Sequence, residues 1–409
     1  MSVGFNWAGY HEYAATRLHH PSTLEQLQQI VAATPKIRAL GTRHSFNDLA
    51  DSAELVSVFA MDPAIEIDED SETVSFSAGL RYGELGVALQ KSGWALRNLA
   101  SLPHISVGGA VATGTHGSGD RNGTLSRAVT GLELVTASGE LLSITPADAA
   151  FDGAVVSLGA LGVVHRITLD IEPSYQVVQE AYRGLTWPIL TENFERIMAR
   201  GYSVSVFTDW QSVGTVLIKS RTDAAAPPQA LYGSPAARTP LSAISGDPAD
   251  NMTQQGGVPG AWIDRLPHFQ LGFTPSNGEE LQTEYIVPAH HALAAIAAVR
   301  ELADHVTPHL LVTELRSMAA DSLWLSGAYE TDAVAIHFTW KKRPTEVLAL
   351  LPVLEAALAP FDARPHWGKL FHTVRRELYP KLSDFVQLAE ELDPTHKFRN
   401  AYLDRNVFG

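Results

Sequence analysis

The chain contains no cysteine, and this absence excludes several kinds of chemistry at once. Disulfides, thiolate metal sites and cysteine nucleophiles all need a sulfhydryl group, so none of them can operate in this protein. Basic clusters are also scarce, since the longest basic run is Lys341 to Arg343 and 45 acidic residues stand against 30 basic ones. A net charge of −15 is opposite in sign to a nucleic-acid-binding surface. We therefore expect no nucleic-acid partner and a neutral substrate.

Long apolar runs and metal-ligand spacings are missing as well. No stretch approaches the ~20 consecutive apolar residues that cross a bilayer, and no basic and apolar leader opens the chain. The histidine pairs at 19–20 and 290–291 are adjacent, and neighbouring positions do not share a helix face, so we expect no metal site. These absences predict a soluble cytoplasmic monomer without a membrane partner.

The length of 409 residues predicts two domains, because one ordinary core does not accommodate so long a chain. Short strands alternate with helices in the first part, which is typical of an α+β fold. We place the boundary at Pro173. Beyond it, longer alternating strands and helices at 289–304 and 345–358 predict a second domain with an antiparallel sheet.

Two local patterns add detail to this outline. Ser22 can cap a helix, because Glu25 follows at the spacing of a capping box. The segment 224–260 is rich in Ala, Pro, Gly and Ser, and we expect it to form a long surface excursion.

The most informative stretch is Ser101 to Gly119, SLPHISVGGAVATGTHGSG, in which five of nineteen residues are glycine. Small residues let the backbone approach a large flat or anionic ligand closely. The order G-x-x-G-x-G reverses the dinucleotide fingerprint and no GK[ST] follows, so neither a Rossmann site nor a P-loop is favoured. A second small-residue turn, LGTRHSF at 40–46, contains His44. Each could be an ordinary loop, but together they predict a cofactor cradle.

Three strand segments in the second domain carry polar side chains at alternate positions. Such a pair is usually a solvated strand face. Three pairs in one domain, with a lysine arriving in a His-Trp-Gly-Lys turn, instead favour a pocket that supplies a donor or acceptor to each hydroxyl of a polyol. The residues are Gln282 and Glu284, Glu314 and Arg316, His337 and Thr339, and Lys369.

The order of the motifs resembles the vanillyl-alcohol-oxidase type of FAD-binding fold. GTRHSF is followed by the glycine-rich stretch and then by SLGALGVV at 157–164. TELRS at 313–317 and RPHWGK at 364–369 are similar to segments of the aldonolactone-oxidase and alditol-oxidase branch of this family. Within that branch, the chain most resembles the bacterial alditol oxidases. The resemblance covers nearly the whole chain.

This resemblance implies a two-domain flavoprotein. The FAD-binding domain would comprise residues 1–173 with a C-terminal return at 376–409, and the substrate-binding cap domain residues 174–375. FAD would be attached covalently through its 8α-methyl group to His44. The other implied FAD contacts are Gly41, Thr42, Arg43, Ser45, Ser101, Ser106, Gly109, Thr113, Gly114, His116, Gly117, Gly162, Val163 and Asn400.

The resemblance also implies a reaction, in which the terminal primary alcohol of xylitol, sorbitol or glycerol passes a hydride to flavin N5. Dioxygen would then reoxidise the flavin and form hydrogen peroxide. Arg316 and Lys369 would stabilise the developing alkoxide and reduced flavin, and Glu314 and His337 would hold the neighbouring hydroxyl. Either His337 or Lys369 would help to remove the proton.

More distant hydroxyls would be bound by Ser101, Gln282 and Thr339. Two alternatives remain at this stage. One is an aldonolactone oxidase or dehydrogenase of the same fold, and the other is a flavoprotein without catalytic activity.

Overall fold

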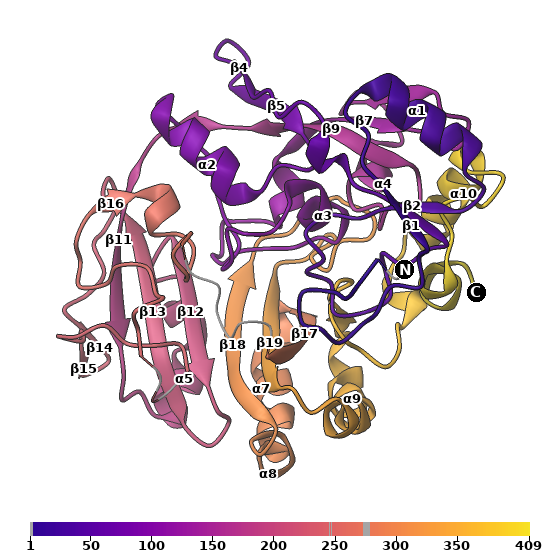
Figure 1. Ribbon diagram of the computed structural model, residues 1–409. Helices are drawn as coiled ribbons and strands as arrows, with labels where there is room; N and C mark the ends of the chain where they lie inside the picture. The colour runs from indigo at the N-terminus through magenta and orange to yellow at the C-terminus, as the bar shows by residue number, and fades with distance from the viewer. Residues whose placement is uncertain (1–2, 245, 247, 273–278) are drawn as a thin grey trace.

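Two antiparallel sheets organise the molecule (Figure 1), which is described here from a computed structural model for residues 3–244, 246, 248–272 and 279–409. The smaller sheet has the strand order β4-β5-β9-β7-β8 and the larger one β16-β11-β13-β12-β18-β19-β17-β20. The smaller sheet comprises β4 (Glu66–Asp68), β5 (Thr73–Ser77), β9 (Val163–Asp170), β7 (Val129–Val135) and β8 (Leu141–Ile144).

The larger sheet comprises β16 (Gly260–Ala261), β11 (Gln176–Tyr182), β13 (Val213–Arg221), β12 (Ser203–Thr208), β18 (Leu310–Met318), β19 (Ala333–Lys341), β17 (Glu280–Pro288) and β20 (Arg364–Pro365). Short parallel strands β1 (Arg17–His19), β3 (Glu54–Val56) and β2 (Ile37–Ala39) stand beside the smaller sheet and lead into the turn that holds His44.

The core around the smaller sheet is built from both ends of the chain. Helices α1 (Leu24–Ala33), α2 (Tyr82–Lys91), α3 (Val107–Ala112) and α10 (Leu382–Leu392) contribute to it. Phe385 on α10 and Tyr402 on α11 (Ala401–Leu403) are buried in the same cluster as Phe76 of β5. The buried guanidinium of Arg38 donates to the carbonyl of Phe398, which ties β2 to the C-terminal segment.

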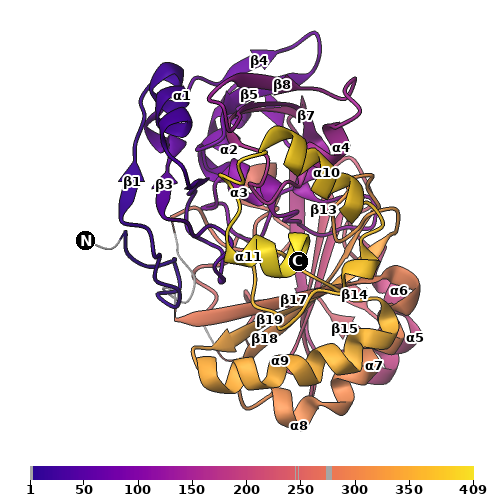
Figure 2. The same cartoon turned by 90° about the vertical axis from the view of Figure 1, so that its right-hand side faces the viewer.

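The two faces of the larger sheet differ because its strands alternate. Val204, Leu315, Ile336 and Phe338 point into one core, which is covered by helices. Burying each such side chain contributes about 1.5–3 kcal/mol. The covering helices are α5 (Trp187–Glu192), α6 (Phe194–Met198), α7 (Ala292–Glu301) and α9 (Pro344–Leu358), of which α7 and α9 lie side by side (Figure 2). The opposite face is therefore left for the polar side chains.

Three local expectations need correction. Thr23, not Ser22, caps α1, because its hydroxyl accepts from the Gln26 N–H at 3.3 Å while the Ser22 hydroxyl donates to the Gln26 side chain. The helix expected at 289–304 is divided, since Leu302 ends α7 before the short α8 (Ala303–Val306). The segment 224–260 is not only a surface excursion, because part of it lines the cavity described below; its residues 245 and 247 lie outside the described part.

One helical stretch in the described part, Pro344–Phe361, is long and apolar enough to cross a membrane by length and composition. Its residues Val347, Leu351 and Leu354 are buried in the core beneath the larger sheet. The structure therefore uses this apolar face as packing surface.

Candidate active site

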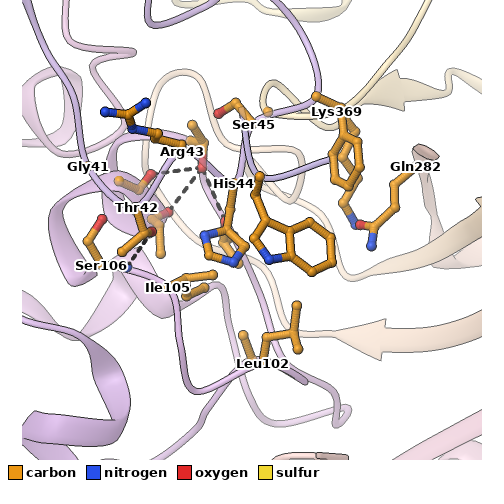
Figure 3. Close-up of a pocket in the computed structure, with 18 of the residues that line it drawn as sticks. Gly41, Thr42, Arg43, His44, Ser45, Leu102, Ile105, Ser106, Gln282 and Lys369 are labelled. Carbon is orange, nitrogen blue, oxygen red and sulfur yellow. Dashed lines mark hydrogen bonds between the residues drawn. The ribbon is translucent and has the colours of Figure 1, made fainter. Parts of the chain in front are cut away.

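A cavity of about 770 Å³ lies between the two halves of the molecule. Figure 3 shows the turn from Gly41 to Ser45 on one side of it and Gln282 and Lys369 on the other. We call these sides the cofactor wall, formed by residues 41–45 and 101–116, and the substrate wall, formed by the polar face of β12, β18, β19 and β17 together with Lys369. A volume of this size is typical of small-molecule and cofactor sites.

The cavity gathers most of the predicted site residues. The predicted residues that line it are Gly41, Thr42, Arg43, His44, Ser45, Ser101, Ser106, Gly109, Thr113, His116, Gly162, Gln282, Glu314, Arg316, His337, Thr339 and Lys369. Gly114, Gly117, Val163 and Asn400 are not part of the lining.

Two of these exceptions have clear packing roles instead. A Cβ at Gly117 would stand 2.4 Å from the carbonyl oxygen of Leu99, so glycine is needed there for backbone packing. The Asn400 amide donates to three carbonyls at 48–51, and its oxygen accepts from the Leu403 N–H at 3.0 Å, which caps α11. Both ends of this amide are thus used by backbone groups, and the contact of Asn400 with the cofactor stays a prediction.

His44 stands in the cofactor wall as a neutral, half-buried ring. Its imidazole stacks on Trp7 with the ring centroids 5.2 Å apart, and the preceding residue, Arg43, adopts a positive φ of 63°. Burial lowers the pKa of His44 to about 4, so the ring carries no charge at neutral pH. Its Nδ1 is buried and has no hydrogen-bond partner of normal geometry among the described residues. An uncharged ring with an unpaired nitrogen at a cavity wall suits a partner that the protein itself does not provide.

Small residues bring the two turns of the cofactor wall together. A Cβ at Gly41 would stand 2.4 Å from the Ser106 hydroxyl, so only glycine permits this approach. The Ser106 N–H donates to the Thr42 hydroxyl at 3.0 Å, which links the turns directly. A Cβ at Gly108 would likewise stand 2.8 Å from the carbonyl of Ala78. The wall is thus a close-packed backbone surface, and together with His44 it fits a large flat cofactor such as FAD.

Glu284 is the centre of the substrate wall. The carboxylate on β17 is 1% exposed and binds three cationic or histidine side chains. Its Oε1 accepts from His116 Nε2 at 3.0 Å and from Arg316 Nη2 at 2.9 Å, and its Oε2 accepts from Lys369 Nζ at 2.5 Å. Burial opposes its ionisation, but Lys369, His116 and Arg316 outweigh this and hold the pKa of Glu284 well below its usual range.

Lys369 and His337 form a hydrogen-bonded pair beside Glu284. Lys369 Nζ donates to His337 Nδ1 at 2.7 Å, which leaves the proton of the neutral ring on Nε2, where it faces the Thr339 hydroxyl at 3.1 Å. Burial and then the charge of Lys369 lower the pKa of His337 to about 4. Burial also lowers the pKa of Lys369 itself. One of the three ammonium protons of Lys369 has no partner among the described residues, so it is available to a ligand.

Arg316 and Glu314 complete the wall from strand β18. Arg316 Nη1 reaches the Ser101 hydroxyl at 3.4 Å, while its buried Nε has no hydrogen-bond partner in the described part of the chain. Glu314 Oε1 lies 3.6 Å from that Nε and accepts from His268 Nε2 at 2.7 Å. Burial opposes ionisation of Glu314, but Arg316 and His268 overcome it and lower the pKa of this carboxyl. An unpaired buried donor beside an ionised acceptor can bind a hydroxyl group.

The sequence predicted only part of this network. Glu284 was predicted as a polar residue of the pocket beside Gln282, but nothing in the sequence marked it as the centre of the network. His366 and His268 were not predicted as site residues. His366 was contained in the RPHWGK segment, and its Nε2 lies 3.4 Å from the Thr115 hydroxyl. His268 belongs to no motif. Among the described residues, no group of three or more His, Asp or Glu side chains is arranged to hold a metal ion.

Comparison with known proteins agrees with this architecture. Residues 15–145 match the family described as "FAD binding domain", and residues 276–406 match "D-arabinono-1,4-lactone oxidase". Cholesterol oxidase from Brevibacterium sterolicum has the same fold, with a TM-score of 0.82 over 100% of this chain and 97% of that one at 15% identity. The expected α+β fold of the vanillyl-alcohol-oxidase type is therefore confirmed.

Two curated relatives cover almost the whole chain. The L-gulono-1,4-lactone dehydrogenase of Mycobacterium tuberculosis is 27% identical over 99% of this chain and 98% of its own length. The alditol oxidase of a Streptomyces species is 47% identical over 97% of both chains. At this identity and coverage, the chain belongs to the alditol oxidase family of FAD-dependent oxidoreductases.

Proposed function

We propose that the protein oxidises the terminal primary alcohol of an alditol, such as xylitol, sorbitol or glycerol, to the aldose and reduces dioxygen to hydrogen peroxide. The observation that carries this proposal is the substrate wall. Arg316, Glu314 and Lys369 offer buried donors and an acceptor to one cavity, opposite a wall that fits FAD. The 47% identical relative is named an alditol oxidase, which supports the same substrate class.

We further propose that His44 carries the flavin covalently. The ring is neutral and its Nδ1 is unpaired and buried at the cavity wall, which is the state that a nucleophilic attachment needs. Gly41, Thr42, Ser106 and Gly109 would hold the cofactor beside it. The test is a denaturing gel of the acid-precipitated protein under ultraviolet light. Fluorescence in the ~44 kDa band of the wild type, and none in His44→Ala, is expected; a dark wild-type band would contradict the link.

The reaction needs a proton acceptor and a cation beside the reacting hydroxyl. FAD, when bound, supplies the hydride acceptor and returns the electrons to dioxygen. Once the Lys369 ammonium has lost the proton that faces the cavity, its amine lone pair accepts the hydroxyl proton, while the other two protons stay on Glu284 and His337. The unpaired Nε of Arg316 stabilises the developing negative charge on the substrate oxygen. Because Glu284 fixes both Lys369 and Arg316, their positions are set before substrate binds.

The remaining polar residues would select for a chain of hydroxyls. The neutral His337 ring points its proton toward Thr339, so the Thr339 hydroxyl can donate to a ligand. Ser101 and Gln282 line the same cavity and extend the row. A substrate without these hydroxyls would leave buried polar groups unpaired, which costs about 1–3 kcal/mol for each group.

A lactone substrate is the second candidate, favoured by the match of residues 276–406 to a lactone oxidase family. Anaerobic mixing of the flavin-loaded protein with xylitol or with a sugar lactone distinguishes the two. Bleaching of the flavin by xylitol alone supports the proposal, and bleaching by the lactone alone overturns it. Readmission of air, with peroxide measured, then separates an oxidase from a dehydrogenase.

A further inference from the structure

A fully buried lysine, Lys219, stands on the cavity side of the larger sheet without a part in the reaction described so far. It is 1% exposed, on β13, two strands away from Glu314 on β18. Burying a charge costs several kcal/mol unless hydrogen bonds and opposite charges compensate for it. No carboxylate lies within ion-pair distance of Lys219 in the described part of the chain. The presence of a buried lysine at this position therefore needs an explanation other than an ion pair.

The surroundings of Lys219 match an ammonium group atom for atom. Nζ donates to the carbonyls of Leu266 at 2.5 Å and Pro267 at 3.1 Å, and to His268 Nδ1 at 3.1 Å. An ammonium has three protons and no lone pair, so these three acceptors satisfy it completely. Among the described residues, His268 is thus the one side chain to which Lys219 donates.

This contact determines which nitrogen of His268 carries the proton. Because Nδ1 accepts from Lys219, the proton of the neutral ring must be on Nε2. Nε2 lies 2.7 Å from Glu314 Oε1, so the ring donates to that carboxylate. The backbone N–H of His268 donates to the Ser101 carbonyl at 3.2 Å, and Phe207 contacts the ring edge-on. The ring therefore has one orientation and one tautomer.

We propose that Lys219 is a positioning residue that acts through His268 to hold Glu314 as an ionised, correctly oriented acceptor for a substrate hydroxyl. This inference rests on the proposed function of the cavity. It differs from a purely structural role, in which Lys219 would only tie β13 to the segment at 266–268. The difference is measurable, because only the relay extends to substrate binding and to pH dependence.

The relay predicts a pH effect. Burial lowers the pKa of Lys219 to about 7, with Glu314 opposing and Arg316 assisting the shift, and His268 is in direct contact. Below this pKa the ammonium fixes the Nε2–H tautomer. Above it, the neutral Lys219 amine can accept a hydrogen bond from an Nδ1–H of His268. In that tautomer Nε2 carries a lone pair, so the ring no longer donates to the Glu314 carboxylate. Affinity for the substrate should therefore fall as pH rises through about 7.

The experiment compares Lys219→Met with Lys397→Met in the flavin-loaded full chain. Lys397 is a matched control, since it is 5% exposed and donates to the carbonyls of Val31 and Ala32, and none of these three residues lines the cavity. Lys219→Met should lower kcat/KM for xylitol about tenfold to a hundredfold, mainly through KM, and abolish the pH limb near 7. Lys397→Met should lose comparable thermal stability with KM and the pH profile unchanged. Identical kinetics for the two variants would overturn the relay.

A double-mutant cycle with Glu314→Gln tests the route of the effect. If Lys219 acts through Glu314, the double variant should have the KM of Glu314→Gln alone; fully additive effects would contradict the proposal. If the wild type oxidises a lactone and no alditol, the proposed substrate is wrong and the same comparison is made with the lactone.

Nitrogen-15 NMR spectra of the histidines, with His268→Asn to assign the signal, report the tautomer of His268 without turnover. An Nδ1–H tautomer of His268 in the wild type below the Lys219 pKa of about 7 would overturn the relay whatever the substrate.

Discussion

The two walls of the cavity bind their ligands in opposite ways. The cofactor wall consists of turns whose small residues let backbone segments meet, and the ring of His44 in it is uncharged, with a buried Nδ1 that has no hydrogen-bond partner among the described residues. The substrate wall consists of strands, and its charged groups Glu284, Arg316 and Lys369 are buried and paired with one another. The comparison teaches that a close-packed backbone surface and one neutral ring would suit a cofactor that stays bound, such as the proposed covalent flavin. A substrate that must enter and leave meets a prearranged set of charges.

The largest effect should follow from removing the proton acceptor of the substrate wall. Lys369→Met should reduce the rate of anaerobic flavin reduction by about 10²–10⁴, because both the base and its charge are lost. Stopped-flow absorbance measures this rate directly. Lys341→Met is the control, since Lys341 is the last residue of β19, its side chain donates to the Pro308 carbonyl, and it does not line the cavity. A Lys369→Met protein that is reduced at the wild-type rate would remove Lys369 from the mechanism.

Loss of the Glu284 carboxylate should lower the stability of the fold as well as the catalytic rate. Glu284→Gln leaves Lys369, Arg316 and His116 without their shared anion, so we expect a loss of about 3–5 kcal/mol in the free energy of unfolding. Urea unfolding at pH 7 measures it. The lowered pKa of Glu284 stabilises the wild type above the ordinary glutamate pKa of about 4.3, and this contribution disappears as pH falls. The difference between the two proteins should therefore shrink in acid; a constant difference would contradict the charge argument.

On the cofactor wall, replacing a glycine by a larger residue should lower the flavin content more than the stability of the fold. In Gly41→Ala the new Cβ would stand 2.4 Å from the Ser106 hydroxyl and push the two turns apart. We expect a several-fold lower flavin content per protein, read from the ratio of absorbance at 450 nm to that at 280 nm. Gly93→Ala provides a comparison, since a Cβ there meets nothing within 4 Å, although its positive φ costs stability. Full flavin loading of Gly41→Ala would show that the turns can separate without loss.

The smallest effect concerns a residue outside both walls. Asn400→Ala removes the cap of α11, which should cost about 1 kcal/mol and lower the melting temperature slightly. The flavin content should stay at the wild-type value, because the Asn400 amide is used by backbone groups. A colourless Asn400→Ala protein would restore the role in cofactor binding that the sequence motif implied.

The sequence predicted contacts between residues close together along the chain better than contacts between distant segments. The two-residue period placed Glu314, Arg316 and His337 on one face, because strand geometry alone determines that alternation. It could not place His116 against Glu284, 168 residues away, since that contact depends on how the two halves dock. The sequence also did not show that Asn400 caps α11, because a cap and a cofactor contact can use the same residue type; its contact with the cofactor stays a prediction. The cap at Thr23 was missed by one position because both neighbouring residues can cap.

Residues 242–244 and 248–251 bear on how substrate preference could differ within the family. Ser242, Ala243 and Asn251 line the cavity from outside the strands, and none of them belongs to the network around Glu284. In that network, the loss of one charged side chain leaves its buried partners without an opposite charge. Ser242, Ala243 and Asn251 are uncharged, so their replacement leaves every ion pair of that network in place. We therefore expect replacements that change substrate preference to be tolerated better at these three positions than at Glu284.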